Sequence, residues 1–177
     1  MTGPGFTVSV TLADERVQAT LGRLAAAAGD LTPAFDDIGG GLVTSTLRRF
    51  ETERDPTGRP WRPLSINTII GRIGSRAKTF TKKGDLRKPA ARYVAALKIL
   101  QHRGHLMGGI HHRASRDAVE VGSDRVYARI HQFGGQAGRG RKVTIPPRPF
   151  LGIDGDDEAM VLGILRGHLG RAIGGEA

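Results

Sequence analysis

The first residues of the chain alternate apolar and polar side chains and then change to a helical period. The stretch FTVSVTL, which starts at Phe6, has the period of two expected of a half-buried strand. Asp14 and Glu15 follow, and carboxylates suit the first turn of a helix because they meet the positive end of its dipole. Apolar residues then recur at helical spacing. We therefore expect a strand at FTVSVTL and a helix over residues 13–28.

A second helix is predicted after Pro33, because five apolar residues can share one of its faces. These residues are Phe35, Ile38, Leu42, Leu47 and Phe50. Three glycines interrupt the pattern at residues 39–41, and each costs about 1 kcal/mol relative to alanine inside a helix. They indicate either a close crossing with another element or a weaker helix.

A proline-rich turn and a basic stretch follow this helix. The segment DPTGRPWRPL contains the only tryptophan of the chain, Trp61. We expect Trp61 to fill the edge of a core rather than to stack on a base, because it buries a large area. A short helix is predicted from Ile66 to Ile73. Beyond it, lysines and arginines without apolar periodicity predict a mobile basic loop around residues 74–92.

The second half of the chain predicts a hairpin, a short helix, a strand and a final helix. Alternation near VEV predicts a hairpin over residues 108–122. Val126, Tyr127 and Ile130 lie at helical spacing, and two glycines after Phe133 stop that helix. An extended loop around residues 134–146 contains the short strand KVTIP, which ends at a proline. DGDDEAMVLGILRGHLGRAIGG is a helix with acids at its start and arginines toward its end.

Length and composition predict one domain with extended arms. A chain of 177 residues suits a single domain over residues 1–177, and 26 glycines predict long loops or close backbone contacts. The net charge is +10, and between Arg59 and Arg116 there are fourteen basic residues against one acid, Asp85. Such a block is either a solvated surface or lies close to DNA or to an acidic partner.

The residues that usually carry catalysis or metal binding are not arranged for it. The chain has no cysteine, and His111 and His112 are neighbours that would point to opposite faces of a strand. No phosphate-binding loop or nucleophile elbow occurs. We therefore expect no metal, no cofactor and no enzymatic activity, and a nuclease would lack its acids. No apolar run of membrane-spanning length is present, so we expect a protein made in the cytoplasm, with no membrane partner.

DNA-binding motifs are also missing, although attraction to phosphate is compatible with the charge. The basic block has no helix-turn-helix pattern, and its aromatic residues are too sparse to form a stacking platform. Non-specific contact with nucleic acid remains open. A non-specific nucleic-acid-binding protein is therefore the alternative to a structural role.

Three motifs in a fixed order carry a family resemblance. A Pro-x-Gly turn leads to the tryptophan, YARIHQFGG follows in the second half, and IPPRPFLGI comes next. From about Arg48 to Ile153 the chain resembles the phage virion morphogenesis family of tail completion proteins. The motif residues, to which we assign a structural role, are Trp61, Tyr127, His131, Gln132, Phe133, Gly134, Gly135, Pro149 and Phe150.

The resemblance implies an α+β fold, in which a small antiparallel sheet packs with several helices and long loops extend as arms. It also implies a structural virion protein that completes the tail and joins it to the DNA-filled head, at the neck. Such a protein would form a homo-oligomeric ring, with six copies to match a tail tube, and its partners would be other neck and tail proteins.

Two exposed segments are candidates for contact with these partners. Residues expected to face DNA or the lumen of the ring are Arg76, Lys78, Lys82, Lys83, Arg87 and Lys88. Residues expected to contact a neighbouring subunit or the neck are Gln136, Arg139, Arg141 and Lys142. For the aromatic residues of the short helix, Tyr127 and Phe133, we favour packing in the core over contact with a partner.

Overall fold

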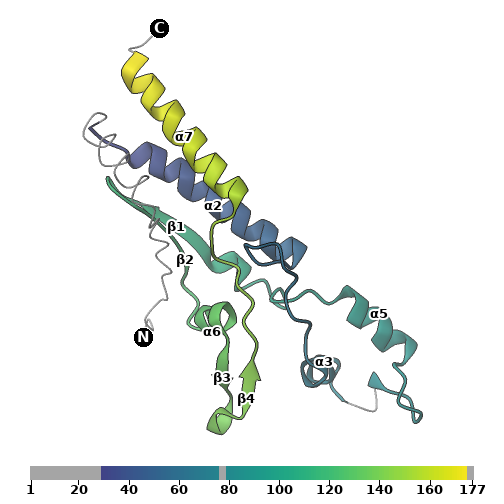
Figure 1. Ribbon diagram of the computed structural model, residues 1–177. Helices are drawn as coiled ribbons and strands as arrows, with labels where there is room; N and C mark the ends of the chain where they lie inside the picture. Colours follow the sequence, from purple (N-terminus) through teal and green to yellow (C-terminus); the bar gives the residue numbers. More distant parts are fainter. Residues whose placement is uncertain (1–28, 76–78, 175–177) are drawn as a thin grey trace.

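One long helix forms the centre of the structure, with a hairpin on one side and a second long helix on the other (Figure 1). The computed structural model describes residues 29–75 and 79–174. The central helix is α2 (Thr32–Thr52), and the second is α7 (Gly155–Gly174). The strand predicted at FTVSVTL and the helix predicted over residues 13–28 lie outside the described residues.

Two of the three glycines in α2 are positions of close approach to another element. This is the first of the two interpretations that the sequence left open, the other being a weaker helix. A methyl group at Gly39 would overlap the ring of His112 on the hairpin, and one at Gly41 would overlap the Met160 side chain of α7. Gly40 faces open space. The central helix therefore has a neighbour on each of two sides, and both neighbours come closer than a side chain on α2 would allow.

The two hairpins are separate small antiparallel sheets. Strands β1 (Ile110–Ala114) and β2 (Val119–Ser123) pair with Ile110 opposite Ser123, and pack against α2. This hairpin confirms the one predicted over residues 108–122. Strands β3 (Gly135–Ala137) and β4 (Val143–Ile145) form the second. Residues 134–146, which we expected as an extended loop, therefore contain a paired hairpin, and only KVTIP was predicted as strand.

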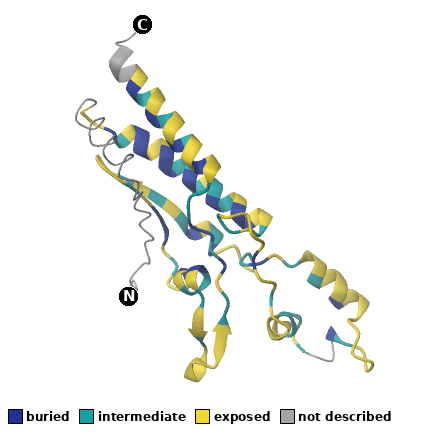
Figure 2. Ribbon diagram, in the orientation of Figure 1, coloured by how far each residue is buried: buried dark blue, intermediate teal, exposed yellow. Residues whose placement is uncertain are grey.

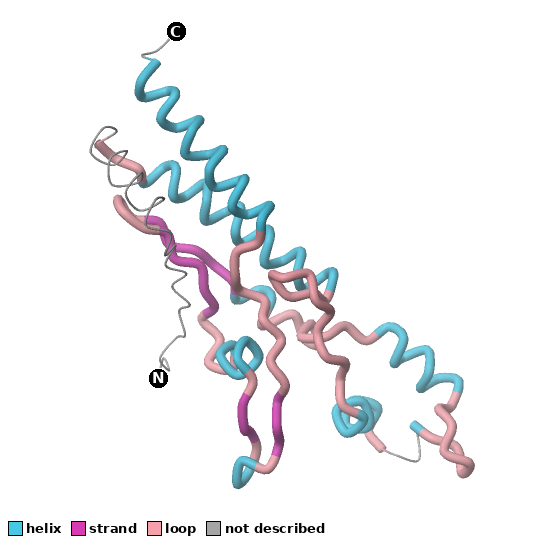
Figure 3. The backbone as a smooth tube through the Cα atoms, viewed as in Figure 1, coloured by secondary structure: helices cyan, strands magenta, loops and turns pink. Residues whose placement is uncertain are grey.

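The connections between these elements form two arms that point away from the helices (Figures 1 and 3). The basic arm, residues 59–103, carries α3 (Ile66–Ile73) and α5 (Lys88–Ala96). The hairpin arm, residues 125–149, carries α6 (Ala128–Phe133) and the β3–β4 hairpin, with the short 3-10 turn η2 (Arg139–Arg141) at its tip. We call the remaining described residues the body; they include the 3-10 turn η1 (Met107–Gly109).

The basic loop is shorter than its sequence predicted. Helix α3 ends at Gly74, which has the left-handed conformation of a C-cap. Residues from Lys88 onward are helical rather than loop, because Pro89 in the first turn has its φ angle preset for a helix and four alanines in α5 favour one. Between them, Phe80 and Leu86 form an isolated bridge.

Three aromatic rings in the core join the end of α2, the tryptophan turn and the segment before α7. The ring of Phe50, at the end of α2, lies 5.6 Å from that of Trp61 in an edge-to-face arrangement, and 5.2 Å from that of Phe150. Phe50 and Phe150 are fully buried. Trp61 is held at the core edge as predicted, and its turn is fixed by Asp55, whose carboxylate accepts hydrogen bonds from the amides of Thr57 and Arg59. The expected α+β fold is confirmed.

Candidate assembly surfaces

The segment that leads from β4 into α7, residues 146–154, is the point where both arms meet the body. We call it the return segment. Gln132 of α6 binds it through three buried hydrogen bonds: its Oε1 accepts from the amides of Phe150 (2.9 Å) and Leu151 (3.0 Å), and its Nε2 donates to the Leu151 carbonyl (2.8 Å). One side chain therefore satisfies a backbone stretch that has no strand partner.

The tryptophan turn holds the same segment from the other side. Trp61 Nε1 donates to the carbonyl of Pro149 at 2.8 Å. In the opposite direction, the buried guanidinium of Arg148 donates to the carbonyls of Arg62 (2.8 Å) and Pro63 (2.9 Å). The motifs around Trp61 and Pro149 thus interlock, which explains why their order in the sequence has a structural meaning.

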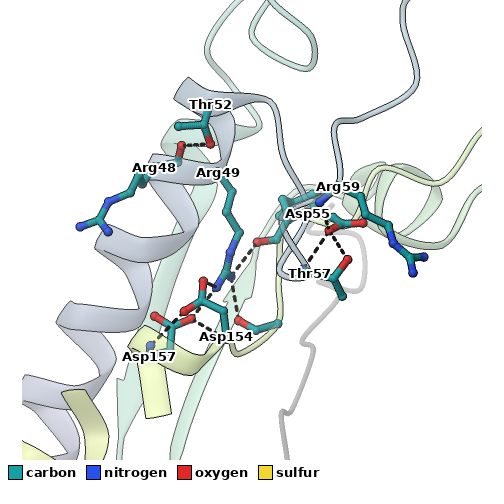
Figure 4. Close-up of polar contacts among 10 residues, drawn as sticks. Arg48, Arg49, Thr52, Asp55, Thr57, Arg59, Asp154 and Asp157 are labelled. Atoms are coloured by element: carbon teal, nitrogen blue, oxygen red, sulfur yellow. Dashed lines mark hydrogen bonds and ion pairs between the residues drawn. The ribbon is translucent and has the colours of Figure 1, made fainter. Parts of the chain in front are cut away.

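Arg49 ties the end of α2 to the start of α7 (Figure 4). Its Nη1 donates to the carbonyl of Gly152 at 2.7 Å, and its Nη2 donates to Asp154 at 2.9 Å and to the buried carboxylate of Asp157. Burial alone would raise the pKa of Asp154, but hydrogen bonds from Arg49 and from the amide of Asp157 outweigh it, so this pKa lies below its ordinary value. The acids at the start of α7 therefore do more than complement the helix dipole.

His131 lies where the hairpin arm meets Arg148. Its carbonyl accepts the Arg148 amide at 2.7 Å, and its ring packs edge-to-face with that of Tyr127 at 6.0 Å. Its Nδ1 is buried and has no hydrogen-bond partner within the described part of the chain. Burial, reinforced by the charge of Arg148, lowers the pKa of His131 below its ordinary value. The ring is therefore neutral at pH 7.

The short helix does not bury the face that we predicted. Tyr127 is 40% exposed and Phe133 is 58% exposed, whereas Ala128 and Gln132 form the buried face of α6. The prediction that these two aromatic residues pack in the core is therefore wrong for the isolated subunit. Helix α6 has only six residues, and its one buried face is occupied by Ala128 and by Gln132, whose amide binds the return segment. The two aromatic residues therefore lie on the other sides of the helix. Both aromatic side chains lie at the surface of the hairpin arm.

The glycine pair after α6 turns the chain into the hairpin. Gly134 has a φ of 73°, and a side chain there would overlap the Ile145 carbonyl and Pro147. Gly135 has a φ of 149°. At the tip, Gln136, Arg139, Arg141 and Lys142 are all exposed. The structure therefore presents the predicted contact residues on a projecting hairpin.

The predicted DNA-facing residues lie on the basic arm, which Figure 2 shows to be largely exposed. Lys82, Lys83, Arg87 and Lys88 are exposed, and Arg87 donates through Nε to the Phe80 carbonyl at 3.0 Å. Arg76 and Lys78 lie outside the described residues. Four of the six predicted side chains thus gather at the outer part of one arm.

A cleft of about 550 Å³ opens between the two arms, and we call it the inter-arm cleft. The basic arm contributes Leu64, Arg72 and Leu100, and the hairpin arm contributes Tyr127 and Ile145. Its lining is mostly apolar with arginines and histidines, and it includes no acidic residue among those that the structure describes. Sequence reasoning missed this cleft because its walls come from segments far apart in the chain.

The described residues offer no sign of a metal centre. No group of three histidine, cysteine or carboxylate side chains in residues 29–75 and 79–174 is arranged to hold an ion. In the same residues, none of the helices combines the length and the apolar character needed to span a bilayer.

Residues 12–170 match the phage virion morphogenesis family. The Mu-like prophage FluMu G protein 2 of Haemophilus influenzae is 33% identical over 149 residues, which cover 84% of this chain and 85% of that protein. Protein G of Escherichia phage Mu is 28% identical over 134 residues, or 75% of each chain. Tail completion protein S of Escherichia phage P2 is 29% identical over 137 residues, covering 73% of this chain and 78% of that one. No solved structure matches the chain.

The chain therefore belongs to the phage virion morphogenesis family, and its role lies in the assembly of a phage particle. The resemblance seen in the sequence is confirmed.

Proposed function

We propose that this protein is a structural, non-enzymatic virion component that completes the phage tail and joins it to the DNA-filled head, at the neck. Family membership over residues 12–170 is the observation that carries the proposal, and one relative of similar length is a tail completion protein. The architecture supports it. Two largely exposed arms extend from a small body.

The arms also support a ring as the working form. A two-stranded hairpin such as β3–β4 has little stability of its own in water, and here it has only three residues in each strand. A neighbouring subunit packed on it would supply the missing contacts. Repeated head-to-tail contacts close into a ring when the rotation allows it, and we propose six copies, to match the symmetry of a tail tube.

The basic arm gives this ring a surface for DNA. Lys82, Lys83, Arg87 and Lys88 are exposed around one turn and the first residues of α5. In a ring through which the genome passes, cations on the inner wall would neutralise phosphate without reading sequence. We propose that the outer part of the basic arm lines or approaches the lumen.

The most direct biochemical test is to restore joining in a lysate. Purified protein is added to a lysate of a phage whose copy of the gene is disrupted, and infectious particles are counted before and after. The proposal predicts that free heads and tails combine and that the count rises well above that of a buffer control. No rise with folded protein, while the gene supplied in vivo restores infectivity, would limit its action to a step before joining.

A non-specific nucleic-acid-binding protein is the second candidate, favoured by the charge of +10. Its signature is binding of duplex DNA by the free subunit, with an affinity that falls steeply with salt. Such binding, together with normal particles from the disrupted phage, would make it the leading account.

A further inference from the structure

The charges of this chain are separated between the arms and the body. The two arms contain eighteen lysines and arginines and a single acid, Asp85. The body, residues 29–58, 104–124 and 150–174, contains thirteen acids and seven lysines and arginines, a net charge of −6. A subunit with a basic and an acidic end attracts a second copy in a head-to-tail orientation, and repels it when like ends meet.

The inter-arm cleft is the place on the basic end that is shaped to hold a partner. Its charged walls include Arg72, Arg103 and Arg148, and its apolar surface includes Leu64 and Leu100. The Nη1 atom of Arg72 is buried without a hydrogen-bond partner in the described residues. A buried donor without an acceptor is costly, so a carboxylate entering the cleft would satisfy it.

The first two turns of α7 present the matching surface on the acidic end. Asp156 and Glu158 are exposed, unlike the neighbouring Asp157, which is buried against Arg49. Leu162 lies one turn after Glu158 on the same side of the helix, and is 41% exposed. Glu158 and Leu162 therefore share one side of α7, whereas Asp156 lies across its exposed face from them, because two residues turn a helix by about 200°. The exposed face of these turns combines carboxylates with an apolar side chain, as the cleft combines arginines with an apolar floor.

We propose that the inter-arm cleft of one subunit receives the first two turns of α7 from a second copy of this chain. Asp156 and Glu158 of the second copy then pair with Arg72 and Arg103, and Leu162 covers the apolar floor. The contact is heterologous, because cleft and helix are different surfaces of each subunit, so it repeats around a ring. This inference rests on the proposed ring and names the contact that builds it. A phosphate backbone would meet the arginines but would leave the apolar floor uncovered.

The test uses two variants of the full chain, each of which damages one half of the contact. The cleft variant carries Arg72→Ala and Arg103→Ala, and the helix variant carries Asp156→Lys and Glu158→Lys. Molar mass is measured by light scattering on a sizing column at low salt. The control variant carries Lys82→Ala and Lys83→Ala, which removes two charges from the same arm outside the cleft.

The expected masses distinguish this contact from others. Wild type and the control assemble beyond a dimer, and each contact variant alone stays a monomer of about 19 kDa. An equal mixture of the two contact variants forms a dimer and nothing larger, because only the intact cleft of one and the intact helix of the other can join. Higher salt dissociates it, since the pairing is ionic.

Other outcomes would overturn the contact. These are assembly of either contact variant by itself, a mixture that remains monomeric, or a wild type that is monomeric. Urea unfolding of each variant shows whether it is as stably folded as wild type. A double variant that does not fold is replaced by a variant with only one of its two substitutions. A monomeric wild type that still restores infectious particles in a defective lysate would refute this contact and leave the proposed function standing. If wild type binds DNA and the cleft variant does not, the cleft binds nucleic acid rather than a second subunit.

Discussion

The Nη2 atom of Arg49 lies 2.9 Å from Oδ2 of Asp154, a residue 105 positions away in the sequence. The same guanidinium binds the buried carboxylate of Asp157 and two backbone carbonyls of the return segment. Both the arginine and Asp157 are almost completely buried. The end of α2, the return segment and the start of α7 are therefore fixed by one charged side chain.

Replacing Arg49 should destabilise the fold strongly. In Arg49→Met the carboxylate of Asp157 stays buried without its partner, and breaking a buried pair in this way costs about 3–5 kcal/mol. Urea unfolding measures the loss. The control is Arg48→Met on the exposed side of the same turn, which should change the free energy of unfolding by no more than about 0.5 kcal/mol. Equal losses in the two variants would contradict the assigned role.

Gln132 should stabilise the return segment through its amide rather than through its size. The variant Gln132→Leu leaves the buried amides of Phe150 and Leu151 without acceptors, and we expect a loss of about 2–3 kcal/mol by urea unfolding. Gln136→Leu, on the exposed hairpin, is the matched control and should have little effect. A tolerated Gln132→Leu would mean that water replaces the side chain at these amides.

The glycines of α2 should respond to alanine in opposite directions. Gly40→Ala adds a methyl group in open space and should stabilise the protein by about 0.5–1 kcal/mol, because alanine favours a helix. Gly39→Ala must displace the His112 ring, which is held by Asp36 at 2.9 Å, and should cost about 1–3 kcal/mol. Thermal unfolding of the two variants side by side tests this order. A more stable Gly39→Ala would show that the hairpin shifts freely on α2.

Stability should fall when the pH drops below the ordinary pKa of histidine, about 6.5. The folded pKa of His131 is lowered by burial and by Arg148, so protonation favours the unfolded chain between the unfolded and the folded pKa. The loss begins as the pH falls through about 6.5 and levels off below the folded value. His131→Gln should flatten this dependence in urea unfolding, whereas His102→Gln, at an exposed position, should retain it. An unchanged slope in His131→Gln would assign the effect elsewhere.

Reversing the charge of the outer basic arm should affect DNA and not folding. A variant with Lys82, Lys83, Arg87 and Lys88 changed to Glu is expected to unfold like wild type, because these side chains are exposed. Particles assembled with this variant should retain less packaged DNA and be at least about tenfold less infectious than wild type, because the four side chains would repel phosphate instead of binding it. Arg113→Glu, at an exposed position on the body, is the charge-reversal control and should leave DNA retention and infectivity unchanged. Full infectivity and DNA retention would remove the basic arm from the lumen.

Much of the body followed from apolar spacing. The period of 3.6 located α2, the charges at its two ends located α7, and alternation near VEV located the β1–β2 hairpin. Helix α3 was also predicted, but it lies on the basic arm and has no buried residue. The glycines of α2 indicated either a close crossing or a weaker helix, and only the structure shows that His112 and Met160 are the close neighbours.

The contacts between distant segments did not follow from the sequence. Arg49 lies on the buried face of α2, at a position where an arginine needs a partner, but spacing does not tell which of the later acids it meets. Pairing of β3 with β4 was missed because a strand of three residues shows little alternation. Tyr127 and Phe133 looked like core residues because an aromatic at helical spacing is usually buried, and α6 instead uses Gln132 for that side.

Electron microscopy of lysates tests the central claim most directly. Particles from a phage whose copy of this gene is disrupted are compared with those from the same phage complemented by the intact gene. The account predicts separate DNA-filled heads and unjoined tails in the first lysate and joined virions in the second. Intact, infectious virions without the gene would contradict it.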